Sequence, residues 1–337
     1  MALTRVAING FGRIGRNAFK LAMANPALEV VAINDLTDTA TLAHLLKYDS
    51  NYGEYHQDII AGQDFLEVQG KKVVVSAIKE PDKLPWKKLE VDVVIESTGR
   101  FTTHKDLKLH LSAGAKQVVL SAPEKDDTYG DTYVIGANEQ TLQPTQNIIS
   151  NASCTTNCIA PVMAVLEKEL GVAKSLMTTV HSYTASQMLQ DGPAKDLREA
   201  RAAAQNIVPT TTGAAIAAAL TVPSLKNRFD GLSVRVPSPV VSLSDITFVA
   251  KRKTSIEEVN KILSHAAATS HRGIIRVSEE ELVSVDYKGD AHSAIVDAKL
   301  TNVVAGDLVK VVAWYDNEWG YSNRLVEMVE LAGNSIR

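Results

Sequence analysis

The sequence predicts an α/β protein of two domains, the first built on a doubly wound parallel sheet and the second on a mixed or antiparallel sheet. Three observations lead to this prediction. The chain has 337 residues, which is more than one domain usually holds. Up to about residue 121, short β-branched runs alternate with amphipathic helical segments, as they do in repeated βα units. After residue 153 the strand-like runs become longer and this alternation stops.

The first part of the chain contains the βα units. Helical spacing places Ile14, Ala18 and Leu21 on one face of the segment 13–25. The segment LEVVAIN at 28–34 is apolar and β-branched, which is typical of a strand buried on both faces of a parallel sheet. We expect strands at 5–9, 28–34, 72–76, 91–97 and 117–121, and helices at 13–25, 39–48 and 103–113.

The second part has a different character. A long helix is expected at 154–170 and an amphipathic helix at 323–332. The strands expected between them lie at 175–181, 231–237, 242–250 and 308–315. A polar segment at about 182–209 has no clear period over much of its length, and loops that long inside a compact domain usually serve a function or an interface.

The composition excludes several classes of protein. Hydrophobic residues make up 45% and charged residues 22%, which is typical of a globular chain and not of a disordered, collagen-like or coiled-coil one. A net charge of −4 is unsuited to sequence-independent nucleic-acid binding. No stretch approaches the roughly 18 apolar residues of a membrane helix. A strand pattern begins almost at the first residue and leaves no room for a signal peptide. We therefore expect a cytoplasmic protein with no membrane or nucleic-acid partner.

A glycine-rich turn, GFGRIG at 10–15, follows the first expected strand and opens the first expected helix. Gly10 permits a tight turn, Gly12 lets the backbone approach a pyrophosphate, and Gly15 allows close packing of helix on strand. Asp35 ends the second strand, where a carboxylate accepts hydrogen bonds from the ribose of NAD and repels the extra phosphate of NADP. A turn without a ligand is the alternative, but the strand, helix and acid together predict a Rossmann-type dinucleotide site.

The two cysteines, Cys154 and Cys158, lie four residues apart in one expected helix. A disulfide between them is geometrically poor, and two cysteines cannot build a structural zinc site, so no metal is expected. Cys154 stands at the helix start among polar residues, where the helix dipole lowers a thiol pKa. Cys158 falls one turn further and is expected to be buried and inert. The alternative is that both are ordinary packed thiols.

His181 ends an expected strand and precedes a polar run. A histidine at such a position can pair with a thiolate and serve as a general base, although the sequence alone does not pair it with Cys154. A thiolate beside a nicotinamide can attack an aldehyde, and the carbon of the resulting thiohemiacetal can donate a hydride. A thioester then remains, which a second nucleophile must release.

Six segments carry a resemblance to a known family: INGFGRIGRN, SNASCTTNC, HSYTASQ, NIVPTTTGAA, VRVPSP and WYDNEWGYSNR. With them the chain resembles the phosphorylating glyceraldehyde-3-phosphate dehydrogenases from residue 6 to about 331. The resemblance implies an NAD-dependent enzyme that converts D-glyceraldehyde 3-phosphate and inorganic phosphate to 1,3-bisphosphoglycerate. It also implies a homotetramer, an NAD-binding domain at 1–153 and 318–337, and a catalytic domain at 154–317 that includes the loop at about 182–209.

The same resemblance implies roles for individual residues. Cys154 would be the nucleophile and His181 its base. Thr184 and Arg235 would hold the phosphate of the substrate. The inorganic phosphate would be held by Ser153, Thr155, Thr212 and Gly213. NAD would be bound by Gly10, Phe11, Gly12, Arg13, Ile14, Asp35, Thr98 and Ser121, with Asn317 on the nicotinamide carboxamide. The alternatives are helix capping for the hydroxyl groups and a structural ion pair for Arg235.

Four residues depart from common patterns of this family: Lys79, Glu199, Ile216 and Val240. None is at a reacting position. Two other functions stay open. The first is that of erythrose-4-phosphate dehydrogenase, a relative that hydrolyses its thioester, and the second is that of an NAD-binding or adhesion protein without enzymatic activity. Thr184 and the PTTTG run favour the phosphorylating enzyme over the first, and the intact pair of Cys154 and His181 argues against the second.

Overall fold

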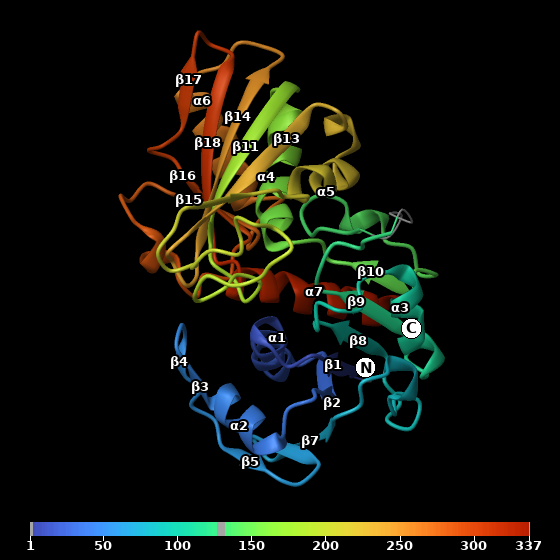
Figure 1. Cartoon of the computed structure of the whole chain (residues 1–337). Coiled ribbons are helices and arrows are strands. Elements are labelled where there is room, and N and C mark those ends of the chain that lie inside the picture. The colour runs from blue at the N-terminus through green and yellow to red at the C-terminus, as the bar shows by residue number, and fades with distance from the viewer. Residues whose placement is uncertain (1–2, 127–131, 337) are drawn as a thin grey trace. The chain divides into compact units, whose positions relative to one another are not determined.

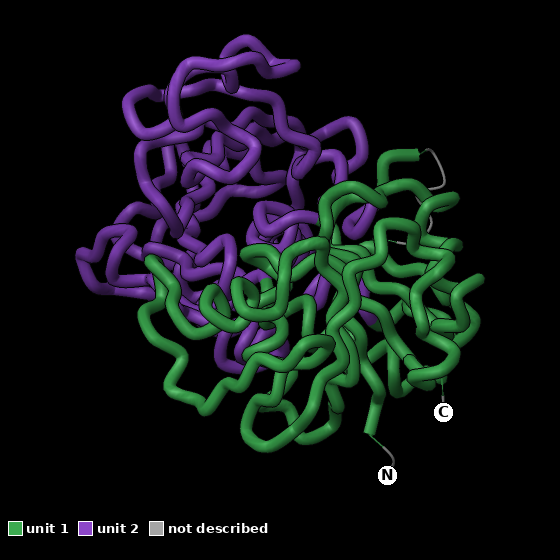
Figure 2. The backbone as a smooth tube through the Cα atoms, turned by 60° about the horizontal axis from the view of Figure 1, so that its bottom comes forward, with its two compact units in different colours: residues 1–133, 140–152, 322–337 green, residues 134–139, 153–321 purple. Residues whose placement is uncertain are grey.

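The computed structural model describes residues 3–126 and 132–336. The chain forms two compact units (Figure 2). Unit 1 comprises residues 1–133, 140–152 and 322–337, and unit 2 comprises residues 134–139 and 153–321. The domain ranges expected from the sequence stay a prediction, and their residues 1–2, 127–131 and 337 lie outside the described part of the chain.

Unit 1 is built on a sheet with the order β10-β9-β8-β1-β2-β7-β6-β5. Its strands are β1 (Thr4–Asn9), β2 (Leu28–Asn34), β5 (Ile59–Ala61), β6 (Phe65–Val68), β7 (Lys71–Ser76), β8 (Val93–Glu96), β9 (Gln117–Leu120) and β10 (Ile148–Ser150). The strands from β10 to β7 pair in parallel, and only β6 and β5 pair antiparallel at one edge. The chain winds one way from β1 to β2 and the other way from β8 to β9, so β1 and β8 flank the switch point where such sheets bind ligands.

The helices of unit 1 begin at capping residues that are visible in the sequence. Helix α1 (Arg13–Ala24) has Gly12 as its N-cap, with no side-chain cap. In α2 (Thr39–Lys47) the carboxylate of Asp38 accepts from a first-turn amide, and α3 (His104–Ser112) begins with a capping box of Thr103 and Asp106. A small hairpin of β3 (Tyr48–Asp49) and β4 (Gly53–Glu54) follows α2. These bounds lie within a few residues of those expected.

Unit 2 carries a mixed sheet with the order β12-β13-β11-β14-β18-β16-β15, and β17 pairs with β18 (Figure 1). Its strands are β11 (Val172–Ser182), β12 (Val208–Thr210), β13 (Phe229–Val236), β14 (Ser242–Ala250), β15 (Ile275–Ser278), β16 (Ala294–Asp297), β17 (Asn302–Val304) and β18 (Leu308–Tyr315). β11 runs parallel to β13 and β15 to β16, while the other pairs are antiparallel. The predicted fold class, α/β with a parallel sheet and a second, mixed sheet, is confirmed.

Three helices belong to unit 2: α4 (Cys154–Glu169), α5 (Ala214–Thr221) and α6 (Ile256–Ala268). α4 packs against β16 and β18 and contacts both α5 and α6. Of these helices, only α4 is predicted from the sequence. The last helix, α7 (Trp319–Ser335), is longer than expected. In the described part of the chain, no helix combines the length and the apolar character needed to span a membrane.

Candidate functional site

A cavity of about 680 Å³ lies in unit 1 at the switch point of the sheet. Among the residues proposed from the sequence to bind NAD, Gly10, Gly12, Asp35 and Thr98 line it. Its other lining residues are Asn9, Asn34, Leu36, Ile78, Lys79, Glu80, Pro81, Asp82, Ser97, Arg100, Phe101 and Leu109. The cavity therefore opens beside the glycine-rich turn and extends along the ends of β1, β2 and β8.

The three glycines of this turn have different structural roles. Gly10 has φ of +91°, and a Cβ there would lie 2.7 Å from the amide nitrogen of Thr98. A Cβ on Gly15 would lie 2.1 Å from the carbonyl oxygen of Gly10. By contrast, a Cβ on Gly12 would meet no described atom within 4 Å, although Gly12 lines the cavity. Gly10 and Gly15 thus permit the close packing of the turn, whereas Gly12 leaves room for a ligand over the N-terminus of α1.

Asp35 is held on the cavity wall by backbone donors. Its Oδ2 accepts from the amide of Phe11 at 2.8 Å, and its Oδ1 accepts from the amide of Thr37 at 3.0 Å. Each oxygen keeps a further lone pair, so the carboxylate can still accept from the hydroxyls of a ribose. A cavity with this carboxylate, an open glycine and a helix N-terminus fits a dinucleotide.

Five residues proposed for NAD do not line this cavity: Phe11, Arg13, Ile14, Ser121 and, in unit 2, Asn317. The ring of Phe11 is buried edge-on against Phe19, with 5.4 Å between centroids. The guanidinium of Arg13 is paired with the Asp49 carboxylate at 2.6 Å. Their roles toward the cofactor stay predictions.

Sequence reasoning missed Asn9 and Asn34, which line the cavity. A signal for both was present, because each is the polar last residue of a parallel strand and directly follows an apolar run, 6–8 in β1 and 30–33 in β2. The carboxyl ends of parallel strands are where α/β sheets bind ligands.

In unit 2 the structure brings Cys154 and His181 together. Cys154 is the first residue of α4, and His181 lies near the end of β11. The Sγ of Cys154 lies 3.4 Å from Nε2 of His181. Nδ1 of His181 donates to the carbonyl oxygen of Ser182 at 2.7 Å, which leaves Nε2 as the nitrogen that can accept a proton. The parallel register of β11 and β13 places Arg235 opposite His181, with its Nη1 2.6 Å from Nδ1 of the imidazole. Cys158, one turn into α4, is fully buried, as expected.

Burial governs the ionisation of this pair. Burial lowers the pKa of His181 to about 3, and the charge of Arg235 acts in the same direction. Burial also raises the pKa of the Cys154 thiol, although the charge of Arg235 opposes this. The backbone amides at the helix start do lower that pKa, as expected, but desolvation outweighs them and the net change is upward. A proton passed from Sγ to Nε2 would create both charges together, so that each stabilises the other.

The residues proposed for phosphate binding differ in how they are engaged. Ser153 caps α4, since its Oγ accepts from the amide of Thr156 at 3.1 Å. The hydroxyl of Thr155 is buried against the hydroxyl of Tyr315 at 2.8 Å. Thr184 bonds to Ser186, with 2.9 Å between their hydroxyl oxygens. These contacts fit the capping alternative for Ser153, and phosphate binding by all three stays a prediction.

The remaining residues proposed to bind phosphate are Thr212, Gly213 and Arg235. Gly213 is the exposed N-cap of α5 and makes no side-chain cap, while Thr212 Oγ1 accepts from the amide of Ala214 at 3.2 Å. Nε of Arg235 is buried and has no hydrogen-bond partner among the described residues. Such a donor is costly to leave unpaired, so it favours an anionic ligand at this place.

Two serines fix the orientation of Asn317. The hydroxyl of Ser242 accepts from the amide of Ser182 at 3.1 Å, so its own hydrogen is left to donate to Oδ1 of Asn317, also at 3.1 Å. Ser182 Oγ donates to the same oxygen at 2.9 Å. The amide nitrogen of Asn317 therefore faces the other way, as a donor. Sequence reasoning proposed Asn317 and missed both serines.

The departures from the family pattern lie at varied places. Lys79 lines the cavity of unit 1, and Val240 is buried. Ile216 is 65% exposed on α5. Glu199 accepts a hydrogen bond from the Thr210 hydroxyl at 3.4 Å. Among the described residues, no cluster of three or more His, Cys, Asp or Glu side chains could hold a metal ion.

Two family models match the chain. Residues 4–104 match the model described as "Glyceraldehyde 3-phosphate dehydrogenase, NAD binding domain". Residues 153–317 match the one described as "Glyceraldehyde 3-phosphate dehydrogenase, C-terminal domain". With the glycine-rich turn at the switch point of a parallel sheet, these matches define an NAD-dependent oxidoreductase, which confirms the predicted class of enzyme and its cofactor, NAD.

Relatives that match over nearly their whole length narrow this class. The chain is 51% identical to a glyceraldehyde-3-phosphate dehydrogenase of Geobacillus stearothermophilus over 96% of both chains. It is 50% identical to glyceraldehyde-3-phosphate dehydrogenase 1 of Bacillus cereus, over 97% of both. Identity to the enzyme of Mycobacterium avium is 50%, over 98% of this chain and 99% of the other. The chain belongs to the glyceraldehyde-3-phosphate dehydrogenase family, as its motifs predict.

Proposed function

We propose that the chain oxidises D-glyceraldehyde 3-phosphate with NAD and inorganic phosphate to 1,3-bisphosphoglycerate, through a thioester on Cys154. The observation that carries this proposal is the 3.4 Å approach of Cys154 Sγ to Nε2 of His181, with Arg235 beside the imidazole. A thiol, a base in reach of it and a cation beside them form a nucleophile of the kind that acyl transfer requires.

The covalent steps use groups of this chain. His181 takes the thiol proton of Cys154, and the thiolate adds to the aldehyde carbon. The carbonyl oxygen takes the proton back from Nε2, which gives a thiohemiacetal. NAD, when bound, supplies the acceptor for the hydride that leaves this carbon. His181 removes the hydroxyl proton as the thioester forms. A phosphate oxygen then attacks the thioester carbonyl, and the thiolate leaves with an acyl phosphate as the product.

The cavity of unit 1 is the proposed site of NAD. The amides at the start of α1 would hold the pyrophosphate across the open face of Gly12, and Asp35 would accept from the adenosine ribose. The same carboxylate would repel a 2′-phosphate, which favours NAD over NADP. Asn317, with its amide nitrogen turned outward by Ser182 and Ser242, would donate to the nicotinamide carboxamide.

Two anion sites complete the proposal. Arg235, with Thr184, would bind the phosphate of the substrate, and the unpaired buried Nε of Arg235 supports this. Inorganic phosphate would bind at the uncapped start of α5, at Thr212 and Gly213, together with Ser153 and Thr155. Few arginines and many hydroxyl and amide donors suit a chain whose net charge is −4.

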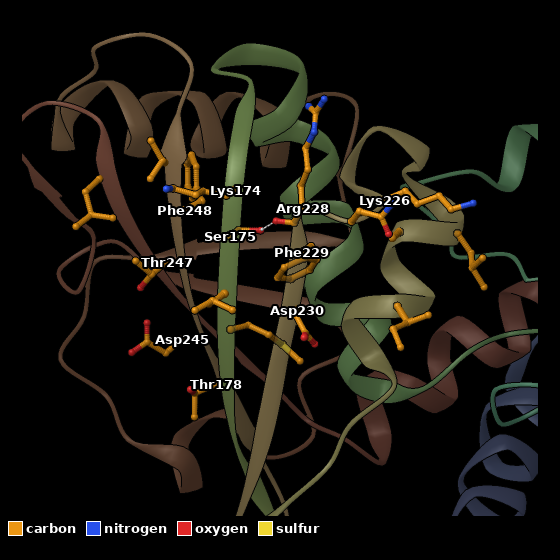
Figure 3. A pocket seen from close by; sticks show the side chains of 18 residues that line it. Lys174, Ser175, Thr178, Lys226, Arg228, Phe229, Asp230, Asp245, Thr247 and Phe248 are labelled. Carbon is orange, nitrogen blue, oxygen red and sulfur yellow. Dashed lines mark hydrogen bonds between the residues drawn. The ribbon is translucent and has the colours of Figure 1, made fainter.

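We further propose a homotetramer in the cytoplasm, and one face of the sheet of unit 2 supports the assembly. A groove of about 1110 Å³ runs over β11, β13 and β14 beside α5 (Figure 3). Leu176 and Ile216 in it are each 65% exposed. Its basic residues are Lys174, Lys226 and Arg228, and its acidic ones are Asp230 and Asp245. An apolar centre with both charges around it is complementary to a second copy of itself.

A pair of matched variants tests the mechanism. Cys154→Ser should lose NADH formation from glyceraldehyde 3-phosphate and keep NAD binding, measured by calorimetry. Cys158→Ser should keep the activity, because that thiol is fully buried and lies on no reaction path. Activity retained by Cys154→Ser would refute the thioester route.

The hydrolytic alternative has its own measurement. NADH formation is followed with glyceraldehyde 3-phosphate and with erythrose 4-phosphate, with and without phosphate or arsenate. We expect sustained turnover of glyceraldehyde 3-phosphate only when phosphate or arsenate is present. Sustained turnover of erythrose 4-phosphate without phosphate would favour the hydrolytic enzyme instead.

A further inference from the structure

A buried hydrogen-bond network stands directly behind the wall of the cofactor cavity. Its centre is Glu96, the last residue of β8, which is fully buried and does not line the cavity. Oε1 of Glu96 accepts from the amide of Thr98 at 2.8 Å and from the hydroxyl of the same residue. Oε2 accepts from Nδ2 of Asn9 at 2.6 Å and lies 3.0 Å from Nε2 of His110. Thr98 and Asn9 both line the cavity, so one carboxylate ties two of its walls together.

The direction of the bonds on one side of Glu96 is fixed by the main chain. The Oδ1 of Asn34 accepts from the amide of Ile78 at 2.9 Å, and its Nδ2 donates to the carbonyl of Ile78 at 2.9 Å. Asn34 cannot turn over without breaking both bonds. Its Nδ2 therefore also donates to Oδ1 of Asn9, at 2.8 Å. Asn9 is then obliged to present its own Nδ2 to Glu96, and so it is a donor there.

On the other side of Glu96, an indole fixes the direction of the hydrogen bond between His110 and the carboxylate. Trp86, which is fully buried, donates from Nε1 to Nδ1 of His110 at 3.0 Å. An indole nitrogen is a donor only, so Nδ1 of His110 must accept, and the neutral ring carries its hydrogen on Nε2. That hydrogen points at Glu96. Every group that surrounds the carboxylate is thus oriented toward it as a donor, and Glu96 acts only as an acceptor.

We propose that Glu96 is a positioning residue for NAD, which holds Asn9 and Thr98 in the cavity wall, and that Trp86 supports it by fixing the tautomer of His110. This inference rests on the proposed placement of NAD in the cavity of unit 1. Glu96 touches no cofactor itself. It acts because a buried carboxylate with four donors has one stable arrangement, and the wall residues share it.

Glu96→Gln is the sharpest perturbation, since it keeps the shape and replaces one acceptor oxygen by a donor. The amide nitrogen of Gln can take the place of either carboxylate oxygen. In one place it faces a hydrogen of Thr98, and in the other it faces the hydrogens of Asn9 and His110, so at least one donor is left unpaired. We expect the NAD dissociation constant, measured by calorimetry on the full chain, to rise about ten- to a hundredfold, the cost of one or two unpaired buried donors. The KM for NAD should rise with it, while the KM for the aldehyde stays unchanged. Glu279→Gln, an exposed carboxylate of unit 2, serves as the control.

A second substitution separates positioning from simple support of the fold. Trp86→Phe removes the indole donor, so His110 can move its hydrogen to Nδ1 and accept from the amide of Gln in the double variant. The double variant should therefore bind NAD more tightly than Glu96→Gln alone. If both substitutions only weakened the fold, the double variant would bind NAD more weakly than either single variant, and the proposal would be overturned.

Further variants distinguish a wrong placement of NAD from a wrong role of Glu96. Gly12→Ala places a methyl group where only a ligand would meet it. If Gly12→Ala binds NAD like the wild type, the placement of NAD fails; if it loses NAD while Glu96→Gln does not, the role of Glu96 fails. Should Glu96→Gln not fold, His110→Gln, which can still accept from Trp86 and donate to Glu96, should keep NAD affinity, and His110→Leu should lose it. Equal affinity in those two would overturn the proposal.

Discussion

Replacing His181 by Gln should make the free energy of unfolding less dependent on pH below about pH 6.5. The imidazole is 5% exposed, and burial together with the charge of Arg235 lowers its pKa from 6.5 to about 3. Below about pH 6.5 the unfolded chain binds a proton at His181, whereas in the folded chain this imidazole stays unprotonated until the pH falls to about 3. The folded state therefore loses stability as the pH falls through that window. Gln binds no proton in either state, so this loss is absent from the variant.

The size of the effect follows from the shift. Over the window, one more proton in the unfolded state gives a slope of about 1.4 kcal/mol per pH unit, and the full shift corresponds to roughly 5 kcal/mol. Urea unfolding of wild type and His181→Gln, at equal protein concentration and at several pH values between about 6.5 and 4.5, measures the two slopes. All other titrating groups are common to both proteins and cancel in the comparison.

A second variant checks the cause of the shift. Arg235→Gln removes the charge that also lowers the pKa of His181, so its slope should lie between those of the wild type and His181→Gln near the acid end. Parallel curves for the wild type and His181→Gln would contradict this prediction, because they would mean that the folded chain protonates His181 as readily as the unfolded one.

Further substitutions test the two units separately. Gly12→Ala should leave the free energy of unfolding within about 0.5 kcal/mol of the wild type and lower NAD affinity at least tenfold by calorimetry, because its methyl group meets only the ligand. Gly15→Ala should instead cost about 1–3 kcal/mol in urea unfolding, since its Cβ would lie 2.1 Å from a backbone carbonyl oxygen. Ser242→Ala removes one of two hydroxyls that orient Asn317 and should raise the KM for NAD about two- to tenfold, without changing the KM for the aldehyde. Leu176→Asp places a charge on the exposed sheet face and should shift sedimentation toward smaller species; an unchanged tetramer would exclude that face as an interface.

Local signals in the sequence predicted much of the fold. β14 and β18 have the expected bounds, and α4 begins at Cys154 because Ser153 caps it. The helices α5 and α6 were missed, along with β5 and β6. An alanine-rich segment such as α5 has little amphipathic contrast, and β5, a strand of three residues, is too short to show a period.

The geometry of the site depended on contacts that no local pattern encodes. The parallel register of β11 and β13 sets His181 opposite Arg235, although 53 residues separate them in the sequence. The desolvation that raises the pKa of Cys154 is likewise a tertiary effect and reverses the expectation from the helix start. Motifs could therefore name the residues, while their charges and hydrogen-bond directions required the structure.

In the proposed mechanism, a thioester on Cys154 must be released by phosphate. Rapid mixing of the NAD-bound protein with glyceraldehyde 3-phosphate, in buffer free of phosphate and arsenate, tests it most directly. We predict a burst of NADH equal in concentration to Cys154, followed by a halt that added phosphate relieves, and no burst from Cys154→Ser. Continuous NADH formation without phosphate, or a burst that survives in Cys154→Ser, would contradict it.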